Sequence, residues 1–352
     1  MSKKLSKQKL NDIITYGIVI AAFVIMQILI NAGEISSLFQ GLMVPLCTYI
    51  ILAISLNLVV GILGELSLGH AGFMCVGAFT SSFFSKAMQD TITNSTVRFL
   101  LALLIGIITA AIFGIIIGIP VLRLNGDYLA IVTLAFGEII KNLVNVLFIG
   151  KDSKGFHFST KDAVSLNMEP DGKIILNGPQ GITGTPNDST FFIGFILILV
   201  TLFIVLNLIH SRDGRAIMAI RDNRIAAESI GINITKYKLM AFSISAGLAG
   251  VAGVLYAHNL SNLTANTNNF GYNMSINILV FVVLGGIGNI RGSIIAAVVL
   301  TLLPELLRGM SDYRMLIYAI VLIVMMLFNW APKAIEWREK HLSFKKNKKE
   351  AA

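Results

Sequence analysis

A few polar side chains that could do chemistry stand inside long apolar stretches of this sequence. Ser67 and His70 lie in the run from residue 61 to 72, and Glu138 and Asn142 lie in a second apolar stretch. Histidine can bind a ligand or carry protons. A charged side chain in a membrane span is costly and therefore a functional candidate. We single out these four residues as the polar lining of a site or path.

Each of these residues also has a simpler structural interpretation. His70 is more simply a packing histidine whose hydrogen bonds are satisfied by its neighbours. Glu138 precedes Lys141 by three residues, and this spacing suits an ion pair on one helix. The sequence favours packing for His70 and does not separate the two interpretations for Glu138.

A second feature is the basic segment from residue 214 to 231, which lies between two apolar spans and is compatible with one helix. Lys and Arg concentrated in a short loop mark the cytoplasmic side of a membrane protein. Small side chains on one face favour insertion into a protein groove, whereas anionic lipid is the alternative partner. The residues predicted to dock are Arg215, Arg221, Arg224, Ala226, Ala227, Glu228 and Gly231, the last as the helix stop.

The composition excludes a soluble globular protein. The 352 residues are 55% hydrophobic and 13% charged, about half the usual charged fraction, and the mean hydropathy is +0.78. The net charge of +9 does not indicate nucleic acid, because the basic residues flank apolar spans, which is a topology signal. Cys47 and Cys75 both lie in apolar segments and give neither a disulfide framework nor a metal-ligand spacing.

Ten apolar stretches are candidate membrane-spanning helices, for which about 20 apolar residues are needed. We therefore predict an all-α integral membrane protein with about ten transmembrane helices, a single domain over 1–352. An even number of spans puts both Lys-rich termini and the 210–237 loop in the cytoplasm and the polar insertion 150–190 outside. The first span is expected to be retained rather than cleaved as a signal peptide, since it is too long for one. The predicted spans are 13–31, 40–62, 66–87, 98–121, 128–149, 191–209, 238–258, 276–288, 292–307 and 313–331, with the short pair around 276–307 the weakest.

Catalytic motifs are absent from the sequence. It contains no phosphate-binding loop of the form Gly-x-x-x-x-Gly-Lys-[Ser/Thr], no His-Glu-x-x-His and no Gly-x-Ser-x-Gly. We therefore expect a chain that is not an enzyme and that holds no metal and no cofactor of its own.

Several motifs together resemble the permease subunits of bacterial branched-chain amino acid ABC importers, of the LivM type. They cover roughly residues 55–330, and in combination they are specific. The matching segments are Gly64-Glu65-Leu66-Ser67-Leu68-Gly69-His70-Ala71-Gly72, Asn125-Gly126-Asp127-Tyr128-Leu129-Ala130, Phe136-Gly137-Glu138-Ile139-Ile140, Gly178-Pro179-Gln180-Gly181-Ile182, 214–231 and Val283-Leu284-Gly285-Gly286-Ile287-Gly288.

The resemblance implies an ABC importer permease fold in the inner (cytoplasmic) membrane. It implies a homologous second permease subunit, two cytoplasmic ATP-binding subunits that bind the ATP, and an extracytoplasmic substrate-binding protein. The segment 214–231 matches the family's coupling loop, although Glu228 follows the alanines where the wider importer consensus has a glutamate before them. Ser67, His70, Glu138 and Asn142 become candidates for the translocation pathway.

The expected function is ATP-driven import of leucine, isoleucine and valine. A permease for urea or another amino acid shares much of the same pattern and stays open. From a different class, a proton-coupled secondary transporter would use Glu138 or His70 for protons. An integral membrane enzyme is a third alternative, which the missing catalytic motifs disfavour.

Overall fold

Long helices make up most of the chain in the computed structural model, which describes residues 2–33, 36–124, 126–170, 172–307 and 313–330. The predicted Lys-rich tail lies outside the described residues. The helices are α1 (Ser2–Asn31), α2 (Ser37–Asn57), α3 (His70–Ala87), α4 (Ser95–Val121), α5 (Asp127–Val146), α6 (Phe191–His210), α7 (Arg212–Asp222), α8 (Arg224–Ser229), α9 (Ile234–Ala257), α10 (Thr267–Phe270), α11 (Tyr272–Gly285), α12 (Ile290–Leu306) and α13 (Arg314–Trp330). A π-helical turn, η1 (Leu58–Leu63), extends α2.

A helix lies over each of the ten predicted spans. Six segments among the described residues are long and apolar enough to cross a membrane: Asp12–Asn31, Ser37–Leu63, Ser95–Val121, Asp127–Val146, Phe191–His210 and Ile234–Ala257. Helix α11 has only 14 residues, about 21 Å at 1.5 Å per residue. The chain is thus a mostly helical membrane protein, and crossing by all ten helices stays a prediction.

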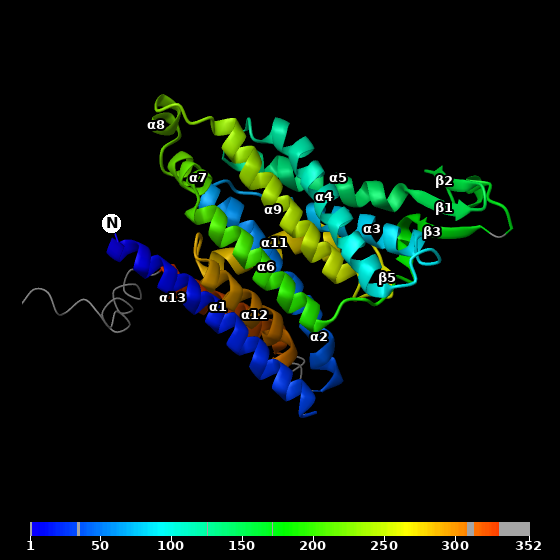
Figure 1. Cartoon of the computed structure of the whole chain (residues 1–352), viewed down its shortest axis with the longest axis horizontal. Helices are drawn as coiled ribbons and strands as arrows, with labels where there is room; N and C mark the ends of the chain where they lie inside the picture. Colours follow the sequence, from blue (N-terminus) through cyan, green and yellow to red (C-terminus); the bar gives the residue numbers. More distant parts are fainter. Residues whose placement is uncertain (1, 34–35, 125, 171, 308–312, 331–352) are drawn as a thin grey trace, which may run out of the picture.

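The two ends of the helix bundle differ in character (Figure 1). The N-terminus and the helices α7 and α8 lie at one end, and the strands β1, β2 and β3 lie at the opposite end. This arrangement agrees with the predicted placement of residues 150–190 and 210–237 on opposite sides. Which end faces the cytoplasm stays a prediction.

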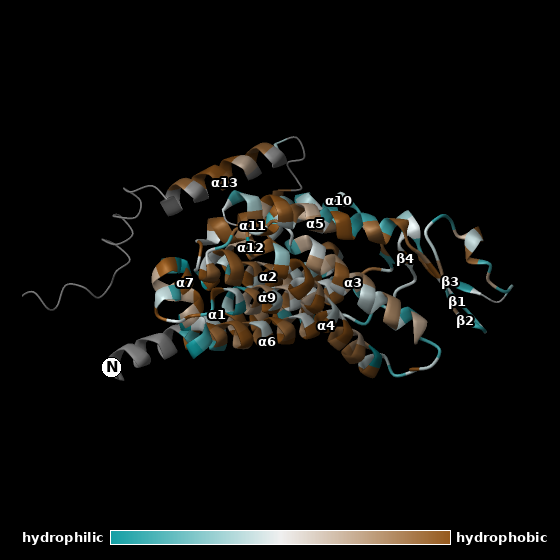
Figure 2. Ribbon diagram, turned by 90° about the horizontal axis from the view of Figure 1, so that it is seen from above, coloured by the Kyte–Doolittle hydropathy of each residue, from teal (hydrophilic) through white to brown (hydrophobic). Residues whose placement is uncertain are grey.

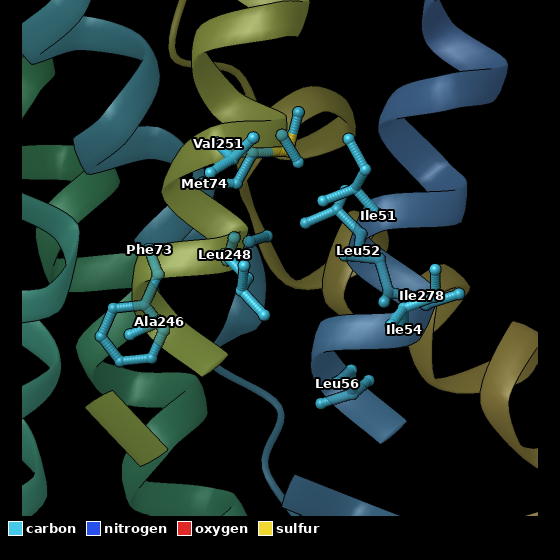
Figure 3. Close-up of a cluster of buried hydrophobic side chains, with 14 of the residues drawn as sticks. Ile51, Leu52, Ile54, Leu56, Phe73, Met74, Ala246, Leu248, Val251 and Ile278 are labelled. Atoms are coloured by element: carbon cyan, nitrogen blue, oxygen red, sulfur yellow. The ribbon is translucent and has the colours of Figure 1, made fainter. Parts of the chain in front are cut away.

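The core is built around α2, which is almost entirely enclosed and packs against α6, α9, α11 and α12. Figure 3 shows Ile51 and Leu52 of α2 facing Met74 of α3 and Leu248 of α9. Helices α3 and α9 approach closely because glycines face each other, so that a Cβ on Gly77 would come within 2.5 Å of Gly250. Small residues at helix contacts are the usual way for membrane helices to pack.

The outer helices α4 and α6 consist largely of apolar residues, as their brown ribbons show in Figure 2, and many of these side chains are exposed. Along α4 the exposed residues include Leu100, Leu104, Ile108, Ile112 and Ile116. Such a stripe on the outside of the bundle suits contact with lipid hydrocarbon.

The structure corrects three details of the sequence prediction. The chain is not purely α-helical, because the polar insertion forms an antiparallel sheet in the order β2-β1-β3. A short strand of the insertion, β4, also pairs with β5 in a later loop. The third span begins at His70 rather than at residue 66, because residues 64–69 are non-helical. The single helix expected over 214–230 is two helices. The strands are β1 (Phe148–Asp152), β2 (Gly155–Ser159), β3 (Lys173–Asn177), β4 (Ile182–Thr183) and β5 (Asn262–Leu263).

Candidate functional site

A non-helical segment, residues 64–69, interrupts the path from α2 to α3. It starts at Gly64, whose φ of +80° ends η1, a backbone conformation that glycine adopts without steric cost. The N–H of Leu68 donates to Thr133 Oγ1 of α5 over 3.0 Å. Ser67 is 1% exposed, and its hydroxyl has no hydrogen-bond partner among the described residues. The segment therefore places an unsatisfied hydroxyl inside the bundle.

His70 opens α3 and is buried. Its Nε2 shares a hydrogen bond of 2.7 Å with Ser55 Oγ of α2, and its ring meets Phe73 edge to face. The carbonyl oxygen of Ser55 accepts a further hydrogen bond from Ser245 of α9. This environment is what a packing histidine requires. A role for His70 in a pathway stays a prediction.

Glu138 forms the ion pair with Lys141 that its spacing suggested, at 2.5 Å. The other carboxylate oxygen accepts a hydrogen bond of 2.7 Å from the N–H of Tyr272, the first residue of α11. Lys141 also donates to Thr267 Oγ1 of α10. A carboxylate at a helix N-terminus is favoured by the helix dipole. Glu138 therefore ties α5 to α10 and α11.

Asn142 lies one turn further along α5 and is exposed. Asn277 of α11 is also exposed. Along the bundle, Asn142 and Asn277 lie on opposite sides of the Glu138–Tyr272 contact. Neither amide has a hydrogen-bond partner within the described part of the chain. An amide facing hydrocarbon without a partner is costly, so this α5–α11 face suits contact with water or protein.

The structure brings the four predicted lining residues to two neighbouring places rather than to one. Helices α3 and α5 cross where a Cβ on Gly72 would come 2.7 Å from Gly137 Cα. Ser67 and His70 lie buried on the α3 side of this crossing, and Glu138 and Asn142 lie on the outer side. Among the described residues, no group of His, Cys, Asp and Glu side chains could hold a metal ion.

The basic segment forms a compact helical tip. Asn223 breaks it, with φ −157°, and caps α8 by accepting a hydrogen bond from the N–H of Ala226. At the other end Gly231 has φ +86°, and the N–H of Ile232 reaches the Ala227 carbonyl oxygen over 3.1 Å. Such a glycine-dependent end is a common helix stop. The predicted role of Gly231 as a stop is therefore confirmed.

The tip is anchored on one side and exposed on the other. Ala227 packs with Ile220 and Ile234, which fixes α8 against α7 and α9. Ile225 and Ile230 are 80% and 75% exposed. The described residues next to them leave an uncovered apolar surface, formed by Ile225, Ala226 and Ile230, which we call the α8 face.

The other predicted docking residues have different positions. Arg215 is exposed and donates to the carbonyl oxygen of His210, and Arg224 and Glu228 are exposed on α8. Arg221 does not share a helix face with Arg224, because the chain breaks at Asn223 between them.

Arg221 instead links α7 to the transmembrane body. Its Nη1 donates to the carbonyl oxygen of Gly61 in η1 over 3.0 Å, and its aliphatic stem covers Gly64. Next to it, Glu65 of the non-helical segment pairs with Lys238 of α9, whose side chains are 14% and 4% exposed. Neither contact was predicted from the sequence, because no periodicity relates residues 160 or more positions apart.

Asn57 is a further residue that the sequence analysis missed. It is fully buried and donates to Ser293 Oγ of α12 over 2.8 Å. Its side-chain oxygen accepts from the N–H of Gly288, over 2.9 Å, in the turn before α12. An asparagine within an apolar span was the only available signal. It holds the turn 286–289 against η1.

At the opposite end, Asp152 organises the β1–β2 hairpin. Partial burial would raise the pKa of its carboxyl group, but hydrogen bonds from the N–H groups of Glu169 and Lys154 and from His157 outweigh burial. The pKa of Asp152 therefore lies below its ordinary value. The hairpin exposes Phe156 and Phe158, at 44% and 67%.

The sequence of this chain is similar to known transport proteins. A family model described as branched-chain amino acid transport system / permease component matches residues 37–328. The high-affinity branched-chain amino acid transport system permease protein LivM of Salmonella typhimurium is 35% identical over 82% of this chain and 67% of its own length. The fructose import permease protein FruG of Bifidobacterium longum is 26% identical over 87% of this chain and 85% of its own length.

A second permease protein of the branched-chain system is also similar. LivH of Salmonella typhimurium is 26% identical over 80% of this chain and 89% of its own length. No solved structure matches the chain.

Proposed function

Because the chain belongs to the family of branched-chain amino acid transport system permeases, we propose that it forms half of the membrane channel of an ATP-driven importer. The substrates are leucine, isoleucine and valine, and the direction is into the cytoplasm. The higher identity to LivM than to the fructose permease supports an amino acid over a sugar.

The α8 face carries this proposal. It presents exposed isoleucines on a helix that Ala227 holds rigidly against α7 and α9. A rigid element seated in a groove transmits the motion of its partner to the helices behind it. We assign the groove to an ATP-binding subunit, two of which hydrolyse ATP while this chain does not. The end of the bundle that carries α7, α8 and the N-terminus then faces the cytoplasm.

The route of force from the α8 face into the membrane follows the contacts of Arg221. Motion of α7 reaches the Gly61 carbonyl directly, and Asn57 passes it to the turn before α12. The Glu65–Lys238 pair connects the same place to α9. Ser67 and His70 follow within a few residues. The segment 64–69 is thus positioned to change the packing of α3 when the ATP-binding subunits close.

We assign the α5–α11 face to the second permease subunit, which is homologous to this chain. Its exposed amides, Asn142 and Asn277, suit a hydrated path between two subunits better than lipid. LivH relatives provide the kind of partner required, because they too are permease proteins of a branched-chain system. Glu138 holds α10 and α11 in place behind this face.

The sheet end receives the substrate-binding protein in this proposal. Exposed Phe156 and Phe158 on β2, an edge strand of the sheet, offer aromatic contacts, which are enriched in protein interfaces. This end is then extracytoplasmic.

Reconstitution tests the proposal. The chain is assembled with a second permease subunit and two ATP-binding subunits in proteoliposomes, with the binding protein outside, and uptake of labelled leucine is measured. Uptake should require ATP inside and should be reduced by unlabelled isoleucine and valine but not by urea or fructose. Uptake that is driven by a proton gradient without ATP would instead identify a secondary transporter. ATP-dependent uptake of urea or fructose alone would support an ATP-driven importer but contradict branched-chain amino acids as its substrates.

A further inference from the structure

An apolar groove separates α1 from the rest of the bundle. It has a volume of about 370 Å³ and is lined by α1, α2, α6 and α12, with Ala22, Phe23, Cys47, Phe195, Ile294 and Val298 among its walls. The lining residues Ile18, Ile25 and Ile295 are also exposed, at 46%, 56% and 51%, so the groove opens to the outside of the bundle. In the described residues nothing fills it.

Helix α1 is anchored at the two ends of this groove, and between them Val19 is buried against the core. At one end Phe23 stacks on Phe195, with ring centroids 3.9 Å apart. At the other end Arg291 of α12 donates to Thr15 Oγ1, and His210 of α6 lies 3.4 Å from Asp12. The hollow between these contacts loses the van der Waals contacts that a packed interior would have. Something that fills it would stabilise the position of α1.

The end of the groove near Thr15 holds the guanidinium group of Arg291, while the Asp12 carboxylate at the same end lies against His210 and not against Arg291. A smaller cavity adjoins the groove there and is lined by Thr15, Ile18, Val19, Arg291, Ile294 and Ile295. Within the described ranges, no carboxylate pairs with Arg291. Its guanidinium fork suits a phosphate group. The groove therefore joins an apolar channel to a site for an anion.

The length of the groove fits one leaflet. From Thr15 to Met26 along α1 is about 16 Å at 1.5 Å per residue, and half of a bilayer's hydrocarbon core is about 15 Å. Arg291 lies in the first turn of α12, next to the turn that contacts Asn57 and η1. This is the end of the bundle that carries α7 and α8, so the charge lies at headgroup level on that side.

We propose that this groove binds one anionic phospholipid, with the phosphate at Arg291 and an acyl chain between α1 and α12. Basic pockets between helices on the cytoplasmic side are a known setting for anionic headgroups. The lipid completes the packing of α1, which lies outside the residues that the family model matches.

Native mass spectrometry of the purified assembly, extracted from membranes with equal phosphatidylglycerol and phosphatidylcholine, tests this site. The unmodified assembly should retain phosphatidylglycerol in preference to phosphatidylcholine. Arg291→Gln should reduce that preference about fivefold, since one basic residue near the surface contributes about 1 kcal/mol. Ala22→Phe should displace both lipids, because the ring fills the groove.

Two matched variants control for general effects. Arg123→Gln removes an exposed arginine elsewhere, and Ala21→Phe places the same ring on α1 outside the groove; both should retain the lipid. Size-exclusion profiles of all variants show whether the assembly remains intact. Equal retention in Arg291→Gln and Arg123→Gln, or in Ala22→Phe and Ala21→Phe, would overturn the proposal. A crosslink from Ile295→Cys to the second permease subunit would also overturn it, because the groove would then hold protein.

Discussion

The Nη1 of Arg221 donates a hydrogen bond to the carbonyl oxygen of Gly61 over 3.0 Å, which joins the basic loop to the π-helical end of α2. Asn57 lies one turn before Gly61 and holds the Gly288 backbone. A Cβ on Gly61 would overlap that backbone. These contacts make α7, η1 and the turn before α12 one mechanical unit. The unit is the proposed route from the α8 face to the transmembrane helices.

Loss of the hydrogen bond between Arg221 and Gly61 should reduce transport without preventing the ATP-binding subunits from docking. Arg221→Ala deletes a charge-assisted hydrogen bond worth about 1.5–3 kcal/mol, and we expect uptake to fall about tenfold while the ATP-binding subunits still co-purify. Arg123→Ala is the matched control, since Arg123 is an exposed arginine outside the basic segment. Equal uptake by the two variants would show that the Arg221 contact transmits nothing.

Each partner of the Glu65–Lys238 pair should be needed for stability only while the other partner is present. The Lys238 side chain is 4% exposed, so Lys238→Met leaves a nearly buried carboxylate unpaired, a change that costs about 3–5 kcal/mol. We expect a marked loss of thermal stability in the purified assembly. The double variant Glu65→Gln with Lys238→Met should recover most of it. A double variant as unstable as the single one would mean that the ionic contact itself is required.

The α5–α11 face should be sensitive to bulk. Asn142→Trp narrows the proposed path and is expected to reduce uptake more than tenfold while the chain still inserts into the membrane. Ile116→Trp on α4 is the control, because Ile116 is 58% exposed on the apolar outer stripe. Uptake and subunit co-purification are measured together. If both variants transport normally, the path does not pass Asn142.

The hairpin at the sheet end should respond to acid through Asp152. Its pKa is lowered in the folded protein by hydrogen bonds that oppose the effect of burial. The stabilisation is therefore present above the unfolded pKa, near 3.9, and is lost as the pH falls through the lower, folded value. We expect binding-protein docking to persist at pH 5 and to weaken below pH 4. Asp152→Asn should weaken docking at all pH values and flatten this dependence in a pull-down assay. An unchanged pH profile in Asp152→Asn would assign the acid response to another group.

The elements that sequence could predict are those with a local cause. Long apolar runs fixed the position of each major helix, and Gly231 was recognised as a stop because a left-handed residue there must usually be glycine. The i,i+3 pair of Glu138 and Lys141 was also visible, since helical spacing alone brings these side chains together.

The parts that were missed depend on contacts between distant segments. Strand β1 pairs with β3 although the sequence between them predicts turns. Strand β4 pairs with β5, whose residues are 79 or more positions away in the sequence. Arg221 lies in the basic segment, where the sequence suggested docking to a partner, and Lys238 lies in α9. Their actual partners are residues 61 and 65, which are far away in the sequence. The break at Asn223 was hidden, because a short cap inside a helix-compatible segment has little effect on periodicity.

Whether the α8 face docks the ATP-binding subunits is tested most directly with an Ala226→Trp variant. Co-purification of these subunits and ATP-driven leucine uptake are measured together. Ala226 is exposed on the α8 face, so Trp should leave this chain folded and inserted but too bulky for a close-fitting groove, at a cost of about 1–3 kcal/mol. Arg212→Trp, at the far end of α7, is the matched control. We expect Ala226→Trp to lose both the ATP-binding subunits and uptake, and Arg212→Trp to keep both. Normal co-purification and normal uptake in Ala226→Trp would contradict docking by the α8 face.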